Sequence, residues 1–379
     1  MKTNIRISQA LSKRDLKQVV TFPWKIYSED PYWVPPLISS QLHRLDKNKN
    51  PFFSYADADV FYAEQDGNIV GTIVPWINHR TNSWLNKIGA GFGYFETINS
   101  QPVTEALIET AVRWAKERNA IYLRGPLYFS PQDSPGVVIT GFDTLPAPMV
   151  GHTPAYYPPL LESLGFRKHR DAFAYEIDLS QFNGRIENIP HNLQRIASIA
   201  EMRYNVQVRP VRMDKWDDEL QSALYIFNEA LGYQREGVPM ADTEFLKMAN
   251  DLRRIIDPDL ICIAEVDGQP VGLYVVLPNV NELLKQLNGH VFPFGWMKLL
   301  RPSKYMNTVS TKILGVLDGY RNKGVDALMY RYVAEQMIRR GYKWMDFSLM
   351  AEENQMANRI IQRFGATVYK ICRTYHMDL

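Results

Sequence analysis

Cysteine is scarce in this chain, with only Cys262 and Cys372 among 379 residues. Neither cysteine lies in a Cys-x-x-Cys or Cys/His spacing that suits zinc, and two cysteines cannot build a disulfide framework. None of the seven histidines falls into a triad or metal-binding spacing, and no Gly-x-Ser-x-Gly is present. These absences argue against a metalloenzyme, a serine hydrolase and a secreted disulfide-rich domain. They predict a cytoplasmic protein without a metal.

Long apolar runs and an excess of one charge are also missing. No run approaches the roughly 18 apolar residues of a membrane-spanning helix, and the first residues lack the apolar core of a signal peptide. The most lipophilic stretch, His290–Leu300, is short and contains a proline. It predicts a buried loop or a contact with an acyl chain. Lys and Arg total 43 against 41 Asp and Glu, without a basic block. This balance predicts no DNA partner and argues against tRNA.

What the chain does contain is an internal repeat. Residues 63–78 and residues 264–279 both read as a strand, an Asp-Gly turn and a second strand, and they lie 201 residues apart. Residues 164–179 match residues 364–379 at a distance of 200 residues. A shared period of this kind indicates two copies of one structural unit.

Between these anchors each copy carries one long amphipathic helix, predicted at Val103–Arg118 and at Ala327–Arg340. Each copy reads as a helix, two hairpin strands, a third strand, the long helix, a strand, a helix and a terminal strand. This order indicates an α/β class with a mixed sheet flanked by helices. The sequence therefore predicts an N-terminal domain over residues 1–180 and a C-terminal domain over residues 181–379. Two insertions distinguish the copies, roughly Gly125–Pro154 in the first and Asn281–Met306 in the second.

One loop of the second copy suggests chemistry. The run Lys312–Leu317 reads as a buried strand, and Asp318–Asp326 leads from it into the long helix. A glycine-containing turn before a helix presents free backbone N–H groups and the positive end of the helix dipole, which together favour a phosphate. Arg321 and Lys323 add positive charge, or else are two solvated basic residues at a helix entry.

The same loop resembles the acyl-CoA loop of the GNAT acyltransferase superfamily, whose core reads Arg/Gln-x-x-Gly-x-Gly/Ala. Arg321 and Gly324 fill its first two marked positions, and Asn354 and Ala357 match the superfamily's following Asn-x-x-Ala motif. The resemblance implies two tandem GNAT-like folds and acetyl-CoA or another acyl-CoA as co-substrate. It implies contacts to that nucleotide from the following residues: Val316, Leu317, Arg321, Asn322, Lys323, Gly324, Val325, Asp326 and Asn354.

Two departures from the superfamily pattern concern the chemistry. Asp326 replaces a small residue of the loop, where it is either a helix-capping carboxylate or a charge that weakens nucleotide binding. Ile361 stands where many GNAT enzymes have a tyrosine that protonates the departing thiolate. The first copy has no Arg-x-x-Gly at the equivalent place, and Pro102 opens its helix. The first domain is therefore expected to lack the nucleotide site.

Acid–base candidates follow from position. Glu352 and Glu353 precede Asn354 at the mouth of the expected site, or are solvated loop carboxylates. Tyr375 lies on a terminal strand and is a replacement acid or a packing residue. Glu96 ends an aromatic strand, where burial raises the pKa of a carboxylate. It is either a base for an acceptor amine bound between the copies or a paired structural residue.

The sequence thus predicts an enzyme, an acyl-CoA-dependent N-acyltransferase, with an acetyltransferase favoured. Its acceptor is expected to be an amine of a small molecule or a peptide. Two alternatives stay open at this point. One is an aminoacyl-tRNA-dependent transferase of the FemX kind, which also has a tandem GNAT fold. The other is a non-catalytic protein that binds acyl-CoA or another ligand.

Overall fold

The computed structural model describes residues 5–129, 136–231, 242–253, 256–292, 295–299 and 306–379. The predicted insertions and the apolar stretch at 290–300 fall partly outside these residues. The strands are β1 Arg6–Gln9, β2 Ala56–Ala58, β3 Phe61–Gln65, β4 Asn68–Asn78, β5 Ala90–Thr97, β6 Tyr122–Gly125, β7 Val137–Thr140, β8 Arg167–Asp178, β9 Val206–Pro210, β10 Ile261–Val266, β11 Gln269–Pro278, β12 Thr308–Val316, β13 Trp344–Ala351 and β14 Thr367–Asp378.

The α-helices alternate with these strands along the chain, as the predicted α/β class requires. They are α1 Lys13–Thr21, α2 Pro23–Ile26, α3 Ile38–Leu45, α4 His79–Leu85, α5 Gln101–Lys116, α6 Tyr157–Ser163, α7 His191–Tyr204, α8 Trp216–Leu231, α9 Asp242–Leu252, α10 Val280–Leu287, α11 Trp296–Leu299, α12 Val325–Arg340 and α13 Gln355–Arg363. The two long helices lie within two residues of their predicted ends.

The two predicted hairpins have the same register. Ala63 pairs with Gly71 in the β3–β4 hairpin, and Ala264 pairs with Gly272 in the β10–β11 hairpin. A bulge follows the alanine in both hairpins. Both Asp-Gly turns take positive φ angles, 51° and 74° at Asp66-Gly67 and 51° and 77° at the second turn. Such turns match the twist of antiparallel strands, so the sequence repeat is also a repeat of backbone geometry.

All strands join one mixed sheet, and the two halves of the sheet exchange their terminal strands. The order is β1-β3-β4-β5-β6-β14-β8-β13-β12-β11-β10-β9, and off this path β2 pairs with β4 and β7 pairs with β14. The last strand of the chain, β14, pairs with β6 of the first half, whereas β8 pairs with β13 of the second half. β8 and β14 also pair with each other, with Glu176 opposite Thr367 and Arg167 opposite His376. Equivalent residues thus pair crosswise, as around a two-fold axis.

Each exchanged strand carries a tyrosine into the core of the other half. Tyr175 of β8 is 1% exposed and donates a hydrogen bond to Asn358 Oδ1 of α13 over 3.1 Å. Tyr375 of β14 is 0% exposed and donates to Glu162 Oε1 of α6 over 2.7 Å. The division of the sequence at residue 180 stays a prediction, because the sheet itself is continuous across both halves.

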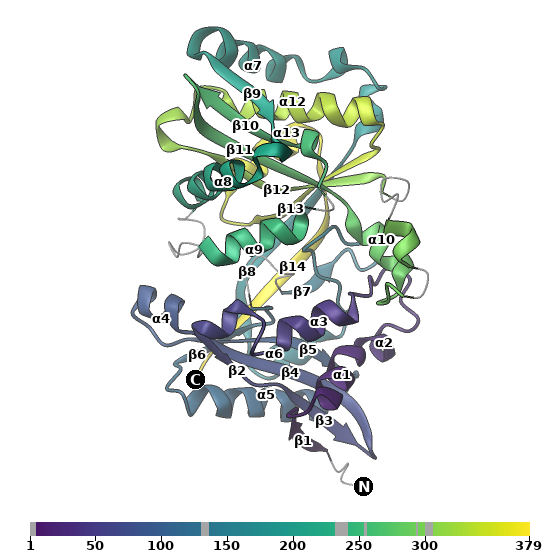
Figure 1. Cartoon of the computed structure of the whole chain (residues 1–379). Helices are drawn as coiled ribbons and strands as arrows, with labels where there is room; N and C mark the ends of the chain where they lie inside the picture. Colours follow the sequence, from purple (N-terminus) through teal and green to yellow (C-terminus); the bar gives the residue numbers. More distant parts are fainter. Residues whose placement is uncertain (1–4, 130–135, 232–241, 254–255, 293–294, 300–305) are drawn as a thin grey trace.

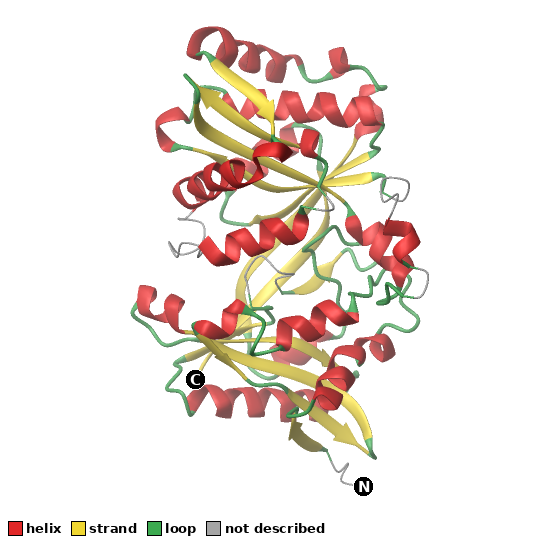
Figure 2. Ribbon diagram, in the orientation of Figure 1, coloured by secondary structure: helices red, strands yellow, loops and turns green. Residues whose placement is uncertain are grey.

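The helices form outer and inner layers around this sheet (Figures 1 and 2). α5 covers the outer face of the first half, and α12 with α7 covers the outer face of the second half. The helices α1 to α3 and the helices α8 to α10 lie between the two half-sheets (Figure 1). An ion pair between Arg80 of α4 and Glu244 of α9, 3.3 Å long, also joins the halves. The middle layer is therefore built from both halves.

Because each core contains a strand of the other half, we expect the chain to unfold in one cooperative transition. Tyr175→Phe removes the hydrogen bonds with Asn358 and Gln362, and Tyr375→Phe removes the one with Glu162. Each variant should lower the free energy of unfolding by about 1 kcal/mol. Urea unfolding followed by both tryptophan fluorescence and circular dichroism measures this. The control is Tyr32→Phe, at a residue 37% exposed. Two separate transitions, of which each variant shifts only one, would contradict the expectation.

Candidate functional site

In each half two parallel strands pair briefly and then part. β12 and β13 pair from Thr308 opposite Trp344 to Thr311 opposite Phe347, and no further. β5 and β6 pair only at Ala90 opposite Leu123 and at Gly91 opposite Arg124. Beyond these points the end of β12 has no partner strand on the β13 side among the described residues, and the end of β5 has none on the β6 side. We call the two openings the second wedge and the first wedge.

The loop from β12 into α12 has the geometry of an anion cradle. Asn322 and Gly324 take left-handed φ angles of 60° and 79°, on either side of Lys323. The first intrahelical hydrogen bond runs from Leu328 N–H to the Gly324 carbonyl. Within the described residues, the N–H groups of 325–327 donate to no protein acceptor. Backbone N–H groups that converge in this way, at the positive end of a helix, suit phosphate oxygens.

Arg321 and Lys323 hold this loop in place. The Arg321 guanidinium donates to the Val316 carbonyl over 3.2 Å and to the Ala230 carbonyl over 3.1 Å, and it pairs with Asp318 at 2.8 Å. The Lys323 ammonium lies 5.0 Å from the ring centre of Tyr320 and 5.8 Å from that of Tyr204. Arg321 therefore fixes the loop to β12 and α8, which sets the direction of the backbone N–H groups.

The remaining residues predicted to contact the nucleotide are placed as follows. A Cβ at Gly324 would come within 2.9 Å of Ile196 on α7, so this position needs glycine for space as well as for its φ angle. Asp326 lies near Tyr330, where burial first and the Asp326 charge second raise the pKa of the tyrosine. Asn354 caps α13 by accepting from Ala357 N–H over 3.3 Å. The nucleotide contacts of these residues stay predictions.

The first wedge is filled by tyrosine hydroxyls. Thr97 pairs with Gly71 as Val316 pairs with Gly272, so Thr97 and Val316 have the same position in the two halves. The Thr97 N–H donates to Tyr157 Oη over 3.0 Å, and Tyr156 Oη donates to the Thr97 carbonyl over 2.7 Å. With Pro102 in the first turn of α5, this gives a structural reason for the prediction that the first half lacks a nucleotide site.

A cavity of about 330 Å³ lies beside the first wedge, and Glu96 lines it. Glu96 Oε2 accepts hydrogen bonds from Tyr157 Oη at 2.7 Å and from Tyr27 Oη at 3.0 Å. Burial raises the pKa of this carboxyl to about 7, although the two tyrosine hydrogen bonds oppose the shift. The apolar part of the wall includes Val34, Pro36, Leu37, Met149, Val150 and Leu284. The cavity thus combines the Glu96 carboxyl with an apolar surface, and Arg44 and His152 also line it.

Both halves close this cavity. Asn281 and Leu284 of α10 belong to the second half and line it. Asn281 Nδ2 donates to the Pro146 carbonyl over 3.0 Å, and Trp24 Nε1 donates to Asn288 Oδ1 over 2.9 Å. The two sequence insertions therefore meet here, in agreement with a pocket between the copies.

Sequence reasoning missed His152 and the buried lysine beside it. His152 lines the cavity, and its Nε2 lies 2.8 Å from Asp30 Oδ2. Lys370 of β14 is 0% exposed and donates to the Gly141 carbonyl over 2.6 Å, and its Nζ lies 3.3 Å from His152 Nδ1. Burial lowers the pKa of Lys370 to about 8. No pattern in the sequence pointed to this lysine, because its burial depends on the exchange of β14.

A second buried cluster lies at the point where β12 and β13 part. Asp346 Oδ2 accepts from Tyr369 Oη over 2.9 Å, and Asp346 Oδ1 lies 3.9 Å from Lys312 Nζ. The Lys312 ammonium donates to the Pro148 carbonyl over 2.5 Å. Burial lowers the pKa of Lys312 to about 8. The sequence had shown Lys312 only as the first residue of an expected strand.

Of the four predicted acid–base residues, Glu96 alone lines the cavity of about 330 Å³ beside the first wedge. Glu352 accepts from Lys168 Nζ over 2.6 Å and from Asp171 N–H over 3.0 Å. Glu353 accepts from Arg170 Nε over 2.9 Å. Tyr375 donates to Glu162 within the core of the first half. Catalytic roles for all four residues stay predictions, and the geometry favours Glu96.

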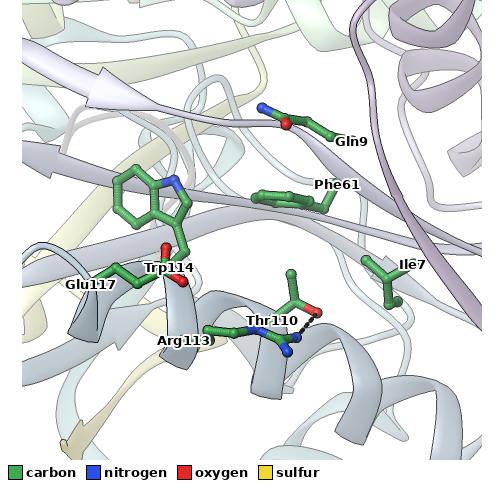
Figure 3. Close-up of a pocket in the computed structure, with 7 residues that line it drawn as sticks. All are labelled: Ile7, Gln9, Phe61, Thr110, Arg113, Trp114 and Glu117. Atoms are coloured by element: carbon green, nitrogen blue, oxygen red, sulfur yellow. Dashed lines mark hydrogen bonds between the residues drawn. The ribbon is translucent and has the colours of Figure 1, made fainter.

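A further cavity of about 270 Å³ lies between α5, the edge strand β1 and its neighbour β3 (Figure 3). Phe61, Thr110 and Trp114 border it, and Arg113 donates to Thr110 Oγ1 over 3.5 Å. It lies on the outer face of the first half, away from both wedges. Among the described residues, no group of His, Cys, Asp and Glu is arranged to hold a metal ion, and no helix is long and apolar enough to cross a membrane.

Comparison with known proteins gives two relatives that match along nearly the whole chain, although no family model matches it. Protein YghO of Escherichia coli (strain K12) is 30% identical over 378 residues, which cover 97% of this chain and 94% of that protein. A protein named bacterial ceramide synthase, from Caulobacter vibrioides, is 30% identical over 372 residues, covering 96% and 95%.

Solved structures show the same fold at low sequence identity. A tandem GNAT protein from the clavulanic acid biosynthesis pathway matches with a TM-score of 0.61 at 11% identity, covering 99% of this chain and 98% of that one. A GCN5-related N-acetyltransferase from Sphaerobacter thermophilus matches with a TM-score of 0.53 at 13% identity, covering 99% and 95%. The predicted tandem GNAT fold is confirmed.

The raised pKa of Glu96 predicts a dependence of stability on pH. The pKa of Glu96 is about 7 in the folded chain and 4.5 for an ordinary carboxyl. The protonated carboxyl therefore contributes its full stabilisation at pH values below 4.5, and this contribution is lost as the pH rises toward 7. We expect a loss of about 2 kcal/mol between pH 4.5 and pH 7, because solvent in the cavity screens part of the effect. Glu96→Gln should remove this difference in the free energy of unfolding, which urea unfolding at pH 4.5 and at pH 7 measures. The control is Glu105→Gln, at an exposed carboxylate, which should lose as much stability as the wild type. If Glu96→Gln loses as much stability as the wild type between the two pH values, the raised pKa of Glu96 is refuted.

Proposed function

Because the chain belongs to the family of tandem GNAT proteins that includes protein YghO and the bacterial ceramide synthase of Caulobacter vibrioides, we propose that it is an acyl-CoA-dependent N-acyltransferase acting on a long-chain amine. A ceramide is the amide of a fatty acid and a long-chain amino alcohol, so that relative's name describes N-acylation of an amine. The observation that carries the acceptor class is the cavity in which the Glu96 carboxyl lies beside a partly apolar wall.

The donor site is proposed at the second wedge. The cradle before α12 takes the pyrophosphate, and the pantetheine arm lies along the end of β12. Val316 supports this placement, because it has the same register as Thr97, whose N–H points into the first wedge. The Val316 N–H therefore points into the second wedge, where it can donate to the thioester oxygen as negative charge develops there.

The acceptor site is proposed at the Glu96 cavity. A primary alkylamine is protonated at neutral pH, and it must lose a proton before its nitrogen can attack a thioester. Glu96 carries a pKa of about 7 and so binds the ammonium as a carboxylate and accepts its proton near neutral pH. The apolar wall from Leu37, Met149 and Leu284 suits the hydrocarbon tail of the amine.

One chain segment separates the two proposed sites. Pro148 accepts from Lys312 at the second wedge, and its neighbours Met149 and Val150 line the Glu96 cavity. His152, four residues after Pro148, accepts at its carbonyl from Tyr27 Oη over 3.3 Å. Four residues span at most roughly 14 Å of extended chain, which supports a single reaction site shared by both halves.

Acyl-CoA should stabilise the protein. Palmitoyl-CoA at about 100 times its dissociation constant should add about 2.7 kcal/mol to the free energy of unfolding. Arg321→Ala should reduce this stabilisation because the cradle loses its attachment to β12 and α8. The control is Arg339→Ala, which removes an arginine that is 61% exposed in the last turn of α12, the helix that follows the cradle. Thermal unfolding with palmitoyl-CoA and with acetyl-CoA measures the effect, and no shift with either thioester would overturn the donor site.

Turnover should require Glu96. With palmitoyl-CoA and a saturated long-chain amino alcohol, we expect thiol release together with formation of the amide. Glu96→Gln should lower kcat/KM for the amine by about 100-fold, as loss of a general base does, and leave stabilisation by acyl-CoA unchanged. Glu105→Gln is the matched control on an exposed carboxylate. If Glu96→Gln retains the wild-type kcat/KM, the acceptor assignment is wrong. Stabilisation by acyl-CoA without thiol release from any amine would favour the non-catalytic alternative.

A further inference from the structure

The buried cluster at the second wedge consists of Lys312, Asp346, Ser310, Ser348 and Tyr369. The side chains of Lys312 and Asp346 are 7% and 3% exposed. Asp346 Oδ1 accepts from the hydroxyls of Ser310 and Ser348, and Asp346 Oδ2 accepts from Tyr369. A buried ammonium and carboxylate are expensive to desolvate, and structures retain such groups most often where they have a function.

The backbone places Lys312 at the apex of the second wedge. In the β11–β12 pairing Val275 lies opposite Ile313 and Val276 lies opposite Thr311, so Lys312 is the extra residue of a bulge. Thr311, the residue before it, is the last residue of β12 that pairs with β13. Lys312 is thus the first residue of the free edge along which the pantetheine arm is proposed to lie.

We propose that Lys312 is a catalytic residue of the acyl transfer, in which its ammonium stabilises the oxyanion and protonates the departing thiolate, and that Asp346 is the residue that positions it. This inference rests on the proposed function. The Lys312 ammonium donates to the Pro148 carbonyl at 2.5 Å and to Ser348 Oγ at 3.4 Å, and Asp346 Oδ1 lies 3.9 Å away, beyond hydrogen-bond distance. An ammonium has three N–H donors, and in this proposal the third turns from Asp346 to the substrate.

The proton balance closes with this residue. The amine, already neutral after Glu96 has taken its first proton, forms the C–N bond to the thioester carbon, and the carbonyl oxygen becomes negative. The C–S bond then breaks, and its electron pair leaves on sulfur. Lys312 gives one proton to that sulfur, and its neutral amine takes the proton that the new amide nitrogen loses. The products are an amide, free CoA thiol, a protonated Lys312 as at the start, and a protonated Glu96, which returns its proton to solvent before the next turnover.

The tyrosines of this region do not supply that proton as readily. Tyr369 donates to Asp346, and burial first and the Asp346 charge second raise the pKa of its hydroxyl well above the ordinary value. Tyr375 lies in the core of the first half. Residue 361 is an isoleucine that is 1% exposed. A lysine whose pKa is lowered to about 8 is a far stronger proton donor at neutral pH than these tyrosines.

The charges that face Lys312 set the direction of its pH dependence. Asp346 of β13 raises its pKa, although burial lowers it more. Glu176 of β8 lies opposite Asp346 in the sheet, and burial and the Asp346 charge raise the pKa of Glu176. Tyr369 of β14 is neutral near pH 8. Lys312 is therefore protonated below about pH 8, so kcat should fall as the pH rises through this value. Asp346→Asn should move that fall to lower pH.

The test compares Lys312→Met with Lys370→Met in the full chain. Both variants remove a buried lysine that donates to a carbonyl of the same loop, Pro148 for Lys312 and Gly141 for Lys370. Steady-state thiol release from palmitoyl-CoA with a long-chain amino alcohol gives kcat against pH, and thermal unfolding gives acyl-CoA binding. We expect Lys312→Met to lower kcat by about 100-fold and to abolish the fall near pH 8, with acyl-CoA stabilisation retained. Lys370→Met should keep the fall near pH 8.

Lys312→Arg covers the case in which Lys312→Met does not fold. Arginine keeps the positive charge but does not release its proton, so this variant should bind acyl-CoA, turn over slowly and show no fall near pH 8. Wild-type turnover in Lys312→Met, or an unchanged fall near pH 8 in Lys312→Arg, would overturn the role of Lys312 and leave the proposed function standing. Absence of acyl-CoA stabilisation in the wild type would instead overturn the proposed function.

Discussion

The antiparallel pair of β8 and β14 is the constraint on which the rest of the molecule depends. Each strand also pairs with the half-sheet of the other unit. Tyr175, from the first half of the sequence, therefore packs in the core of the second half, and Tyr375, from the second half, packs in the core of the first half. The crosswise pairing of Arg167 with His376 and of Glu176 with Thr367 fixes the two wedges relative to each other. A site shared by both halves requires such fixed geometry, because displacements of about 1 Å are costly for catalysis.

On this shared scaffold the two halves differ where the strands part. Glu96 and Gly315 have equivalent positions, since Glu96 lies opposite Thr72 in the β4–β5 pair and Gly315 lies opposite Leu273 in the β11–β12 pair. In the first half the carboxyl and two tyrosine hydroxyls occupy the wedge. In the second half Gly315 lets α8 pack closely, because a Cβ there would lie 3.1 Å from Ala230 Cβ, and the cradle before α12 keeps its backbone donors. These differences support the proposal of an amine site in the first half and a phosphate site in the second half.

The parts of this arrangement that local sequence determines could be predicted. The Asp-Gly turns, the long helices and the loop around Gly324 depend on residues close together in the chain, and the structure has them near their expected bounds. The exchange of β8 and β14 could not be predicted, because either strand fits either half-sheet by its own pattern. Lys312, Asp346 and Lys370 were missed for the same reason, since their burial is decided by neighbours far along the chain. Glu352 and Glu353 looked free only because Lys168 and Arg170 lie on the exchanged strand.

The buried lysines also explain why one half alone would not suffice for the proposed reaction. Lys312 and Lys370 belong to strands β12 and β14, yet both donate to carbonyls of the first half's insertion, at Pro148, Gly141 and Thr144. An ammonium taken out of water costs several kcal/mol unless it is well paired, so these contacts hold the insertion firmly against the second half. The same insertion supplies Met149, Val150 and His152 to the cavity wall. Lys312 and Lys370, which belong to the half with the proposed acyl-CoA loop, thus fix the shape of the proposed acceptor cavity. The free edge of β12 starts at Lys312.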